Sequence, residues 1–269
     1  MDVTQSTVIP PYKRYARSFF FAFCLLQSAS YGHAAQEPIT TQKMTGLAEQ
    51  GYAEAQYKLG AHYATGNGVA QDIKKSMAWY RKAAEQGHTD AQYMMGIHYY
   101  LGKRIGQDYK QAVAWFLKAA EQSHVLAQYQ LGSRYFDGKG VAQDNKQAVT
   151  WFRKAAEQGH AAAQYNLGVL YVNGQGVAQN AKQAVTWFRK AAEQGHTDAQ
   201  GNLGIMYFNG QGVPQDDGHA YVWSSVASAN GSTSATELRD FLAKKLSNIK
   251  LEEMQKLAAQ YFERYQPVR

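Results

Sequence analysis

Apolar and small residues recur along most of the chain with the spacing of an α-helix. Ala55, Leu59 and Tyr63 are four residues apart, which places them on one stripe of a helix and does not fit the alternation of a strand. A second stripe contains Trp79 and Ala83 and mixes small residues with large aromatic ones. Small residues allow two helices to approach closely while an aromatic ring fills the gap beside them. The pattern predicts two packed helices, called helix A and helix B below.

This pair of stripes returns every 36 residues. Columns of similar residues mark the period, among them a glycine on helix A and a tryptophan on helix B. A fixed period of this size is typical of a repeat array. We expect the tryptophan column to belong to the core rather than to a ligand platform. The tryptophans are Trp79, Trp115, Trp151, Trp187 and Trp223, and the five units are residues 52–87, 88–123, 124–159, 160–195 and 196–231.

A glycine-containing turn separates the two helices of each unit. In the first unit it comprises Gly66, Asn67 and Gly68, and Asp72 follows where helix B begins. Glycine tolerates the positive φ angle that ends a helix, and an aspartate at this place accepts hydrogen bonds from the next helix N-terminus. A phosphate-binding loop is disfavoured because the turn lies between two helices rather than after a strand. The second unit has Arg104 in place of the second glycine, so we expect a locally altered turn there.

The repeats are flanked by segments that fit the role of caps. Residues 36–51 end like a helix B and are interpreted as an N-terminal half-repeat. Residues 232–269 contain two further amphipathic segments, one lined by leucines and one that includes Tyr261 and Tyr265. An array of this kind exposes apolar surface at each end unless a polar-backed element covers it. We therefore predict a helical cap at residues 232–269.

The N-terminus has the three parts of a secretory signal peptide. Basic residues precede the apolar run 19–26, and a stretch of small residues follows up to Ala34 and Ala35. The apolar run is too short to span a bilayer. We predict that residues 1–35 are a signal peptide, cleaved after Ala34 or Ala35, and that the mature protein is periplasmic or secreted. A retained anchor is the alternative.

Cysteine content and charge exclude several classes of protein. Cys24 is the only cysteine, so neither a disulfide framework nor a cysteine zinc site can form. Phe23 stands where lipoprotein signals carry a small residue, which disfavours a lipid anchor on Cys24. Loss of residues 1–35 removes three basic residues and one acidic residue and lowers the net charge from +7 to +5. This charge is spread along the array and does not form the concentrated basic face of a nucleic-acid binder.

The repeat resembles a known family. From Ala148 to Val177 the chain reads Ala-x-x-Trp-Phe-x-x-Ala-Ala-Glu-Gln-Gly-His-x-x-Ala-Gln-Tyr-x-Leu-Gly-x-x-Tyr-x-x-Gly-x-Gly-Val. This run is similar to the Sel-one-like repeat (SLR), a relative of the tetratricopeptide repeat, and it recurs in register over residues 52–231. The resemblance implies an all-α fold, a right-handed α/α superhelical solenoid whose helix A side chains line a concave surface. It also implies an adaptor or assembly scaffold, often of the bacterial envelope or of host interaction.

Helix A positions that vary between repeats are the candidates for partner binding, because the architecture does not dictate them. They form a mixed polar face with apolar spots that suits an extended protein segment or peptide. The alternative is a solvated face without a ligand. Reversing the charge at Lys58 and Arg134 is expected to weaken partner capture without lowering thermal stability. The candidates are Lys58, His62, Met94, His98, Gln130, Arg134, Asn166 and Asn202.

The sequence offers no ligand set for a metal and no basis for a cofactor. One histidine follows helix B in each of four units, and neighbouring copies should be separated by a repeat width of roughly 10 Å, too far to share an ion. His62 and His98 have the same separation problem. The histidines after helix B are His88, His124, His160 and His196.

Catalytic residues are equally hard to identify, since no Ser-His-Asp arrangement or activated cysteine is present. We therefore expect a non-enzymatic, monomeric protein with a protein or peptide partner, no nucleic-acid partner and no stable membrane insertion after signal cleavage. The alternative is a cell-envelope enzyme of the β-lactamase-like or penicillin-binding type reported for cysteine-rich relatives. Those relatives rely on paired cysteines in each repeat, which this chain lacks after signal cleavage. Turnover of nitrocefin by the purified protein would favour the enzyme.

Overall fold

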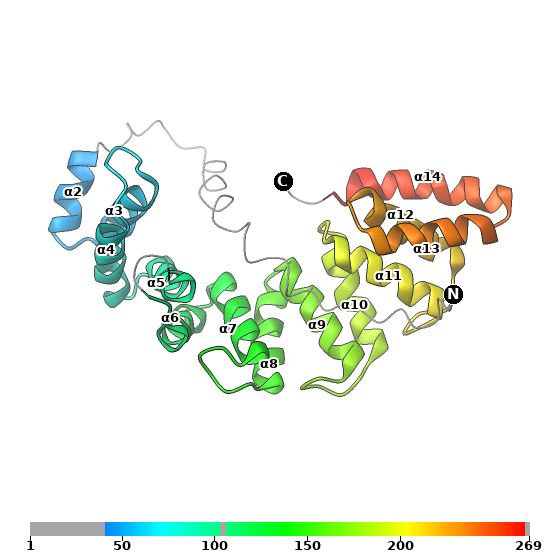
Figure 1. Cartoon of the computed structure of the whole chain (residues 1–269), viewed down its shortest axis with the longest axis horizontal. Coiled ribbons are helices and arrows are strands. Elements are labelled where there is room, and N and C mark those ends of the chain that lie inside the picture. Colours follow the sequence, from blue (N-terminus) through cyan, green and yellow to red (C-terminus); the bar gives the residue numbers. More distant parts are fainter. Residues whose placement is uncertain (1–40, 103–105, 267–269) are drawn as a thin grey trace. The chain divides into compact units, whose positions relative to one another are not determined.

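The computed structural model describes residues 41–102 and 106–266, and within these ranges every regular element is an α-helix (Figure 1). The predicted signal peptide and Arg104 lie outside the described residues. The helices are α2 (Thr41–Glu49), α3 (Ala53–Thr65), α4 (Ile73–Glu85), α5 (Thr89–Leu101), α6 (Tyr109–Glu121), α7 (Val125–Asp137), α8 (Asn145–Glu157), α9 (Ala161–Asn173), α10 (Ala181–Ala192), α11 (Thr197–Asn209), α12 (Asp217–Ala229), α13 (Thr233–Lys245) and α14 (Asn248–Arg264).

The all-α prediction is confirmed, because antiparallel helix pairs follow one another with the predicted period. Helix A of the five repeats corresponds to α3, α5, α7, α9 and α11, and helix B to α4, α6, α8, α10 and α12. Each helix A contacts the helix B that follows it, and within a compact unit each helix B contacts the next helix A, as expected of a solenoid. The described residues divide into two compact units, one up to Gln122 and one from Ser123.

The turn between helices A and B has the predicted chemistry. Gly66, with φ at 80°, ends α3 in the left-handed conformation, and glycines at the same position end the other four helices A. Asp72 caps α4, because its Oδ1 accepts a hydrogen bond from the backbone N–H of Lys75 at 3.0 Å. In the second repeat, Gly102 ends α5 and Asp108 caps α6 in the same way.

Close contact between helices A and B explains the glycine column of helix A. A Cβ atom on Gly132 would lie 2.6 Å from the ring of Phe152, and one on Gly168 would lie 2.7 Å from the ring of Phe188. Any larger residue would therefore push the two helices apart. In the fifth repeat Ser224 takes the place of the aromatic residue and faces Gly204.

The tryptophan column lies in or beside the core, as predicted. Trp115, Trp151, Trp187 and Trp223 are buried, and Trp79 is partly buried against the apolar cluster of α2 and α3. Four of the rings are covered by a lysine three residues later, with the amino nitrogen 4.2–4.5 Å from the ring centroid. The fifth ring, Trp223, has a different cover that comes from α14.

The last two helices both pack on α12 (Figure 1). Helix α13 begins like another helix A, with Ser232 as its N-terminal cap, and it buries Leu238 and Leu242. Helix α14 then turns back and buries Met254 and Ala258 in the same apolar cluster. The far end of α14 thereby brings two tyrosines against the core of the fourth and fifth repeats.

Candidate functional site

The histidines after helix B are helix caps. His88 accepts a hydrogen bond at Nδ1 from the backbone N–H of Ala91 at 3.3 Å, and its ring stacks on Tyr57 with centroids 4.7 Å apart. The same capping bond recurs at His124, His160 and His196. Burial lowers the pKa of His160 to about 4, so the ring stays neutral and keeps the lone pair that the cap requires. Histidine is not among the favoured cap residues, which is why the sequence pattern did not reveal this role.

The fixed glutamine column connects adjacent helices. Gln92 donates to the backbone oxygen of Ala84 at 3.2 Å and accepts from Gln122 at 2.7 Å. These buried amides are satisfied inside the framework and are not available to a ligand. The equivalent side-chain pairs are Gln86 with Gln56, Gln158 with Gln128, Gln194 with Gln164, and Asn230 with Gln200.

An arginine of helix B bonds the fixed tyrosine of the next helix A in three places. The Nη2 atom donates to the tyrosine hydroxyl at 2.7 Å in the pair Arg81 and Tyr99, at 3.1 Å in Arg153 and Tyr171, and at 2.7 Å in Arg189 and Tyr207. The fixed columns therefore have structural roles, and the variable positions of helix A remain as the candidate partner-binding face.

The eight residues predicted for this face differ in accessibility. Lys58 is exposed at the rim of α3, where its amino group pairs with Glu54 at 3.0 Å. Four others are half-buried, and three are buried. The half-buried residues are His62, Met94, Gln130 and Asn166, and the buried ones are His98, Arg134 and Asn202, which are 5%, 5% and 6% exposed.

The buried members of the face are held among their neighbours. The ring of His98 packs beside Tyr80 with centroids 5.8 Å apart, and burial lowers its pKa to about 4. Nη2 of Arg134 lies 4.0 Å from a carboxylate oxygen of Asp137. The expectation for charge reversal at Arg134 changes as a result, because the variant would bury a carboxylate and lose stability as well as any binding. Lys58, Gln130 and Asn166 are better probes of binding alone.

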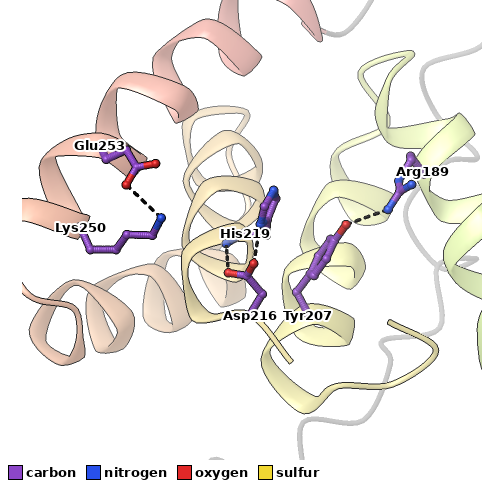
Figure 2. A network of polar contacts seen from close by, with 6 residues as sticks. All are labelled: Arg189, Tyr207, Asp216, His219, Lys250 and Glu253. Carbon is purple, nitrogen blue, oxygen red and sulfur yellow. Dashed lines mark hydrogen bonds and ion pairs between the residues drawn. The ribbon is translucent and has the colours of Figure 1, made fainter. Parts of the chain in front are cut away.

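A second feature, which the sequence did not reveal, is a pocket of about 300 Å³ within the unit that begins at Ser123. Its wall is formed by Arg189 from α10, Glu193 at the C-terminal cap of that helix, Tyr207 from α11, and His219 and Trp223 from α12. Figure 2 shows the Arg189–Tyr207 bond and, on the neighbouring helix, His219 held by Asp216 with Nδ1 and Oδ2 2.7 Å apart.

Helix α14 completes the pocket with Tyr261 and with Tyr265, which is its C-terminal cap residue. The ring of Tyr265 stacks on Trp223 at an interplanar angle of 20°, and Tyr261 meets the same ring edge-on. The backbone oxygen of Tyr265 accepts a hydrogen bond from Gln200 at 3.0 Å, which ties the end of α14 to α11. Sequence reasoning assigned both tyrosines to the apolar stripe of the cap, and nothing in their spacing indicated which repeat they would meet.

Metal binding and membrane insertion each require a structural feature that can be recognised in the described part of the chain. Residues 41–102 and 106–266 contain no cluster of three or more histidine, cysteine, aspartate or glutamate side chains that could hold a metal ion. None of the helices in these ranges is both long and apolar enough to cross a membrane.

Two crystal structures resemble this chain along most of its length. One is a protective antigen present in uropathogenic Escherichia coli strains, which displays an SLR fold; it is 39% identical, with a TM-score of 0.76, over 86% of this chain. This chain matches 50% of the length of that antigen. The other is a Sel1 repeat protein from Oxalobacter formigenes, 32% identical with a TM-score of 0.70, over 82% of this chain and 93% of that one. No curated protein gives a significant match.

The Sel1 repeat pattern itself matches five times in succession, at residues 53–88, 89–124, 125–160, 161–196 and 197–232. Proteins built from these repeats are generally protein-interaction scaffolds and typically have no catalytic activity. The five matches cover about two thirds of the chain with the predicted period of 36 residues, each one residue later than the predicted unit, and they show that this protein belongs to the Sel1 repeat family.

Proposed function

We propose that this protein is an exported, non-catalytic scaffold that binds an extended segment of a partner protein along the helix A face of its repeats. The observation that carries the proposal is that fixed and variable positions of each repeat have different roles. Residues of the fixed columns form the helix caps, the glutamine pairs and the arginine–tyrosine bonds. The eight candidate positions of helix A, which differ between repeats, take part in none of these three recurring contacts. Repeat proteins commonly bind ligands with such variable faces.

The burial of the candidate residues shows which of them a partner could reach. Gln130 on α7 and Asn166 on α9 are half-buried amides on consecutive helices A of one compact unit. Each amide has donors and an acceptor that can bond a peptide backbone, and the Asn166 amide also hydrogen-bonds the side chain of Tyr129. Arg134 and Asn202 are buried beneath the accessible part of this face. In the other unit, Lys58, His62 and Met94 are the accessible members of the face.

Site-specific photo-crosslinking tests the proposed face. A photoreactive phenylalanine analogue replaces Gln130 or Asn166 in the whole chain, and the matched control carries it at Gln147, an exposed position on helix α8. In the producing cell we expect a discrete crosslinked partner from the two helix A positions and none from Gln147. Crosslinking of the same species from all three positions, or from Gln147 alone, would contradict the proposal.

Export is the second part of the proposal and rests on the basic, apolar and small-residue order of residues 1–35. We expect the protein in the envelope or culture fraction with its mature N-terminus at Ala35 or Gln36. Cell fractionation followed by mass spectrometry of the N-terminal peptide measures both. Recovery of the uncleaved chain from the cytoplasm would contradict export. It would not contradict partner binding on the helix A face, which the crosslinks test separately.

A further inference from the structure

The pocket completed by α14 is built from a wall that earlier repeats also contain. Arg153, Tyr171 and Trp187 repeat the places of Arg189, Tyr207 and Trp223 one unit earlier. The earlier wall has Gln183 where the pocket has a histidine, and a lysine lies over Trp187 where tyrosines of α14 cover Trp223. The combination of His219, Tyr261 and Tyr265 around Arg189 and Tyr207 therefore belongs to the end of the array and does not recur at Arg153.

The lining of this pocket is polar although aromatic rings supply most of it. The faces of these rings are occupied by one another: Trp223 stacks with Tyr265, and Tyr207 stacks with His219 at a centroid distance of 5.2 Å. Hydroxyl and nitrogen atoms are therefore the groups that the rings can offer to a ligand. A planar apolar ligand would have to compete with these stacking contacts, whereas a small polar group would not.

Hydrogen-bond donors are in excess among these groups. The hydroxyl oxygen of Tyr207 already accepts from Arg189, so its own proton is available for donation. Burial and the neighbouring Tyr265 and Tyr207 raise the pKa of Tyr261, so this hydroxyl also remains a donor. Nδ1 of His219 faces the carboxylate of Asp216, which fixes the ring and leaves Nε2 as its other polar atom.

The arginine is the strongest of these donors, and it is an exposed side chain without an ion pair among the described residues. Its one hydrogen bond among the described residues goes to the neutral Tyr207, and within 4.0 Å of Arg189 the described chain places no carboxylate. Glu193 is the acidic residue of the lining, and it is exposed at the C-terminal cap of α10. A guanidinium with free N–H groups matches the two oxygens of a carboxylate in a bidentate arrangement.

We propose that the pocket between α10, α11, α12 and α14 binds a carboxylate group, with Arg189 as its charged anchor and the hydroxyls of Tyr207 and Tyr261 as further donors. The carboxylate can belong to the C-terminus of a peptide or to a free small carboxylic acid, since both present the same two oxygens. This site goes beyond the proposed scaffold function, because none of its residues belongs to the predicted partner-binding set on helix A.

Calorimetric titration of the whole chain separates the two sources. The probes are the acetylated dipeptide Ala-Phe with a free C-terminus, the same dipeptide as its C-terminal amide, and benzoate. We expect the acid dipeptide to bind and the amide to bind at least about 10-fold more weakly, as the loss of a charged hydrogen-bonding pair predicts. Binding of benzoate alone assigns the site to small carboxylic acids and also supports the proposal. Equal affinity for acid and amide, or no binding of any probe, overturns it.

The chain contains its own matched control. Arg189→Gln should weaken binding of the preferred acid by about 10-fold to 100-fold, whereas Arg153→Gln, at the same place one repeat earlier, should leave it unchanged. Circular dichroism melting checks that both variants are folded. If Arg189→Gln does not fold, Tyr207→Phe with Tyr171→Phe as its control replaces the pair, with a smaller expected loss of about 3-fold to 10-fold. Equal losses in a matched pair would indicate general attraction to basic surface and overturn the proposal.

Discussion

The fourth and fifth repeats share one framework but differ in what covers their tryptophans. The amino group of Lys190 lies 4.5 Å from the centroid of the Trp187 ring, on the exposed side of α10. In the fifth repeat Val226 occupies the place of that lysine, and the ring of Tyr265 covers Trp223 instead. The cover in the fourth repeat is local to its helix, whereas the cover in the fifth comes from a segment more than thirty residues away.

This difference teaches that identical repeat positions acquire different chemistry from their neighbours. Arg153 and Arg189 make the same bond to a tyrosine, yet only the second lines the pocket that α14 completes. The end of an array must be covered because its apolar side has no further repeat to pack against. In this protein the covering helix also brings polar groups, so that the stabilising element creates the candidate carboxylate site.

The largest expected contrast concerns the residue that faces the helix A glycine. Phe188 is fully buried against Gly168, so Phe188→Ala should lower the free energy of unfolding by about 3–4 kcal/mol through lost burial and the cavity it leaves. Ser224 holds the same place in the fifth repeat, and its buried hydroxyl has no hydrogen-bond partner among the described residues. Ser224→Ala should therefore be neutral or slightly stabilising. Urea unfolding measures both, and similar losses would show that the two interfaces are equivalent after all.

A second contrast is between the histidine caps of the repeats and the serine cap of α13. Burial depresses the pKa of His160 from 6.5 to about 4, so the folded state binds fewer protons than the unfolded state between these values. The contribution of the neutral His160 to the free energy of unfolding is complete above pH 6.5 and is lost as the pH falls towards 4. Between pH 7 and pH 5 the loss amounts to about 2 kcal/mol. His160→Ser copies the cap at Ser232 and should make unfolding less sensitive to acid over this range. An unchanged pH dependence in urea unfolding would show that His160 does not titrate as described.

The smallest contrast concerns the covers of the two tryptophans. Tyr265→Ala removes ring contacts to Trp223 and Tyr261 and should cost about 2 kcal/mol. Lys190→Ala removes an exposed amino group above Trp187 and should cost about 0.5 kcal/mol. Thermal unfolding of the two variants compares them directly. Equal costs would mean that α14 covers the fifth repeat no more firmly than a lysine covers the fourth.

Much of the fold could be predicted because the repeated residues act locally. The helix stripes, the glycine that ends helix A and the residue that caps helix B depend on neighbours within a few residues. The repeats reinforce the inference, because the glycine recurs in all five and the cap is aspartate in four of them and Asn180 in the other. The histidine caps escaped prediction because histidine is not among the favoured cap residues, and only the structure shows that Nδ1 faces the backbone N–H at the start of the next helix. The face residues were placed on the correct helices, but His98, Arg134 and Asn202 proved to be buried, since burial depends on how adjacent helices A pack.

The sequence by itself determined the period, the helix pairs and the family, because each of these follows from the spacing of residues within one short segment of the chain. Tertiary structure alone decided which variable residues remain accessible and where α14 lies. Helix α14 has an ordinary amphipathic stripe that could cover many apolar surfaces, and its spacing contains no information about its partner. Its position follows from the unsatisfied end of the fifth repeat, where Trp223 and α12 provide the apolar surface that its buried side chains and tyrosines cover.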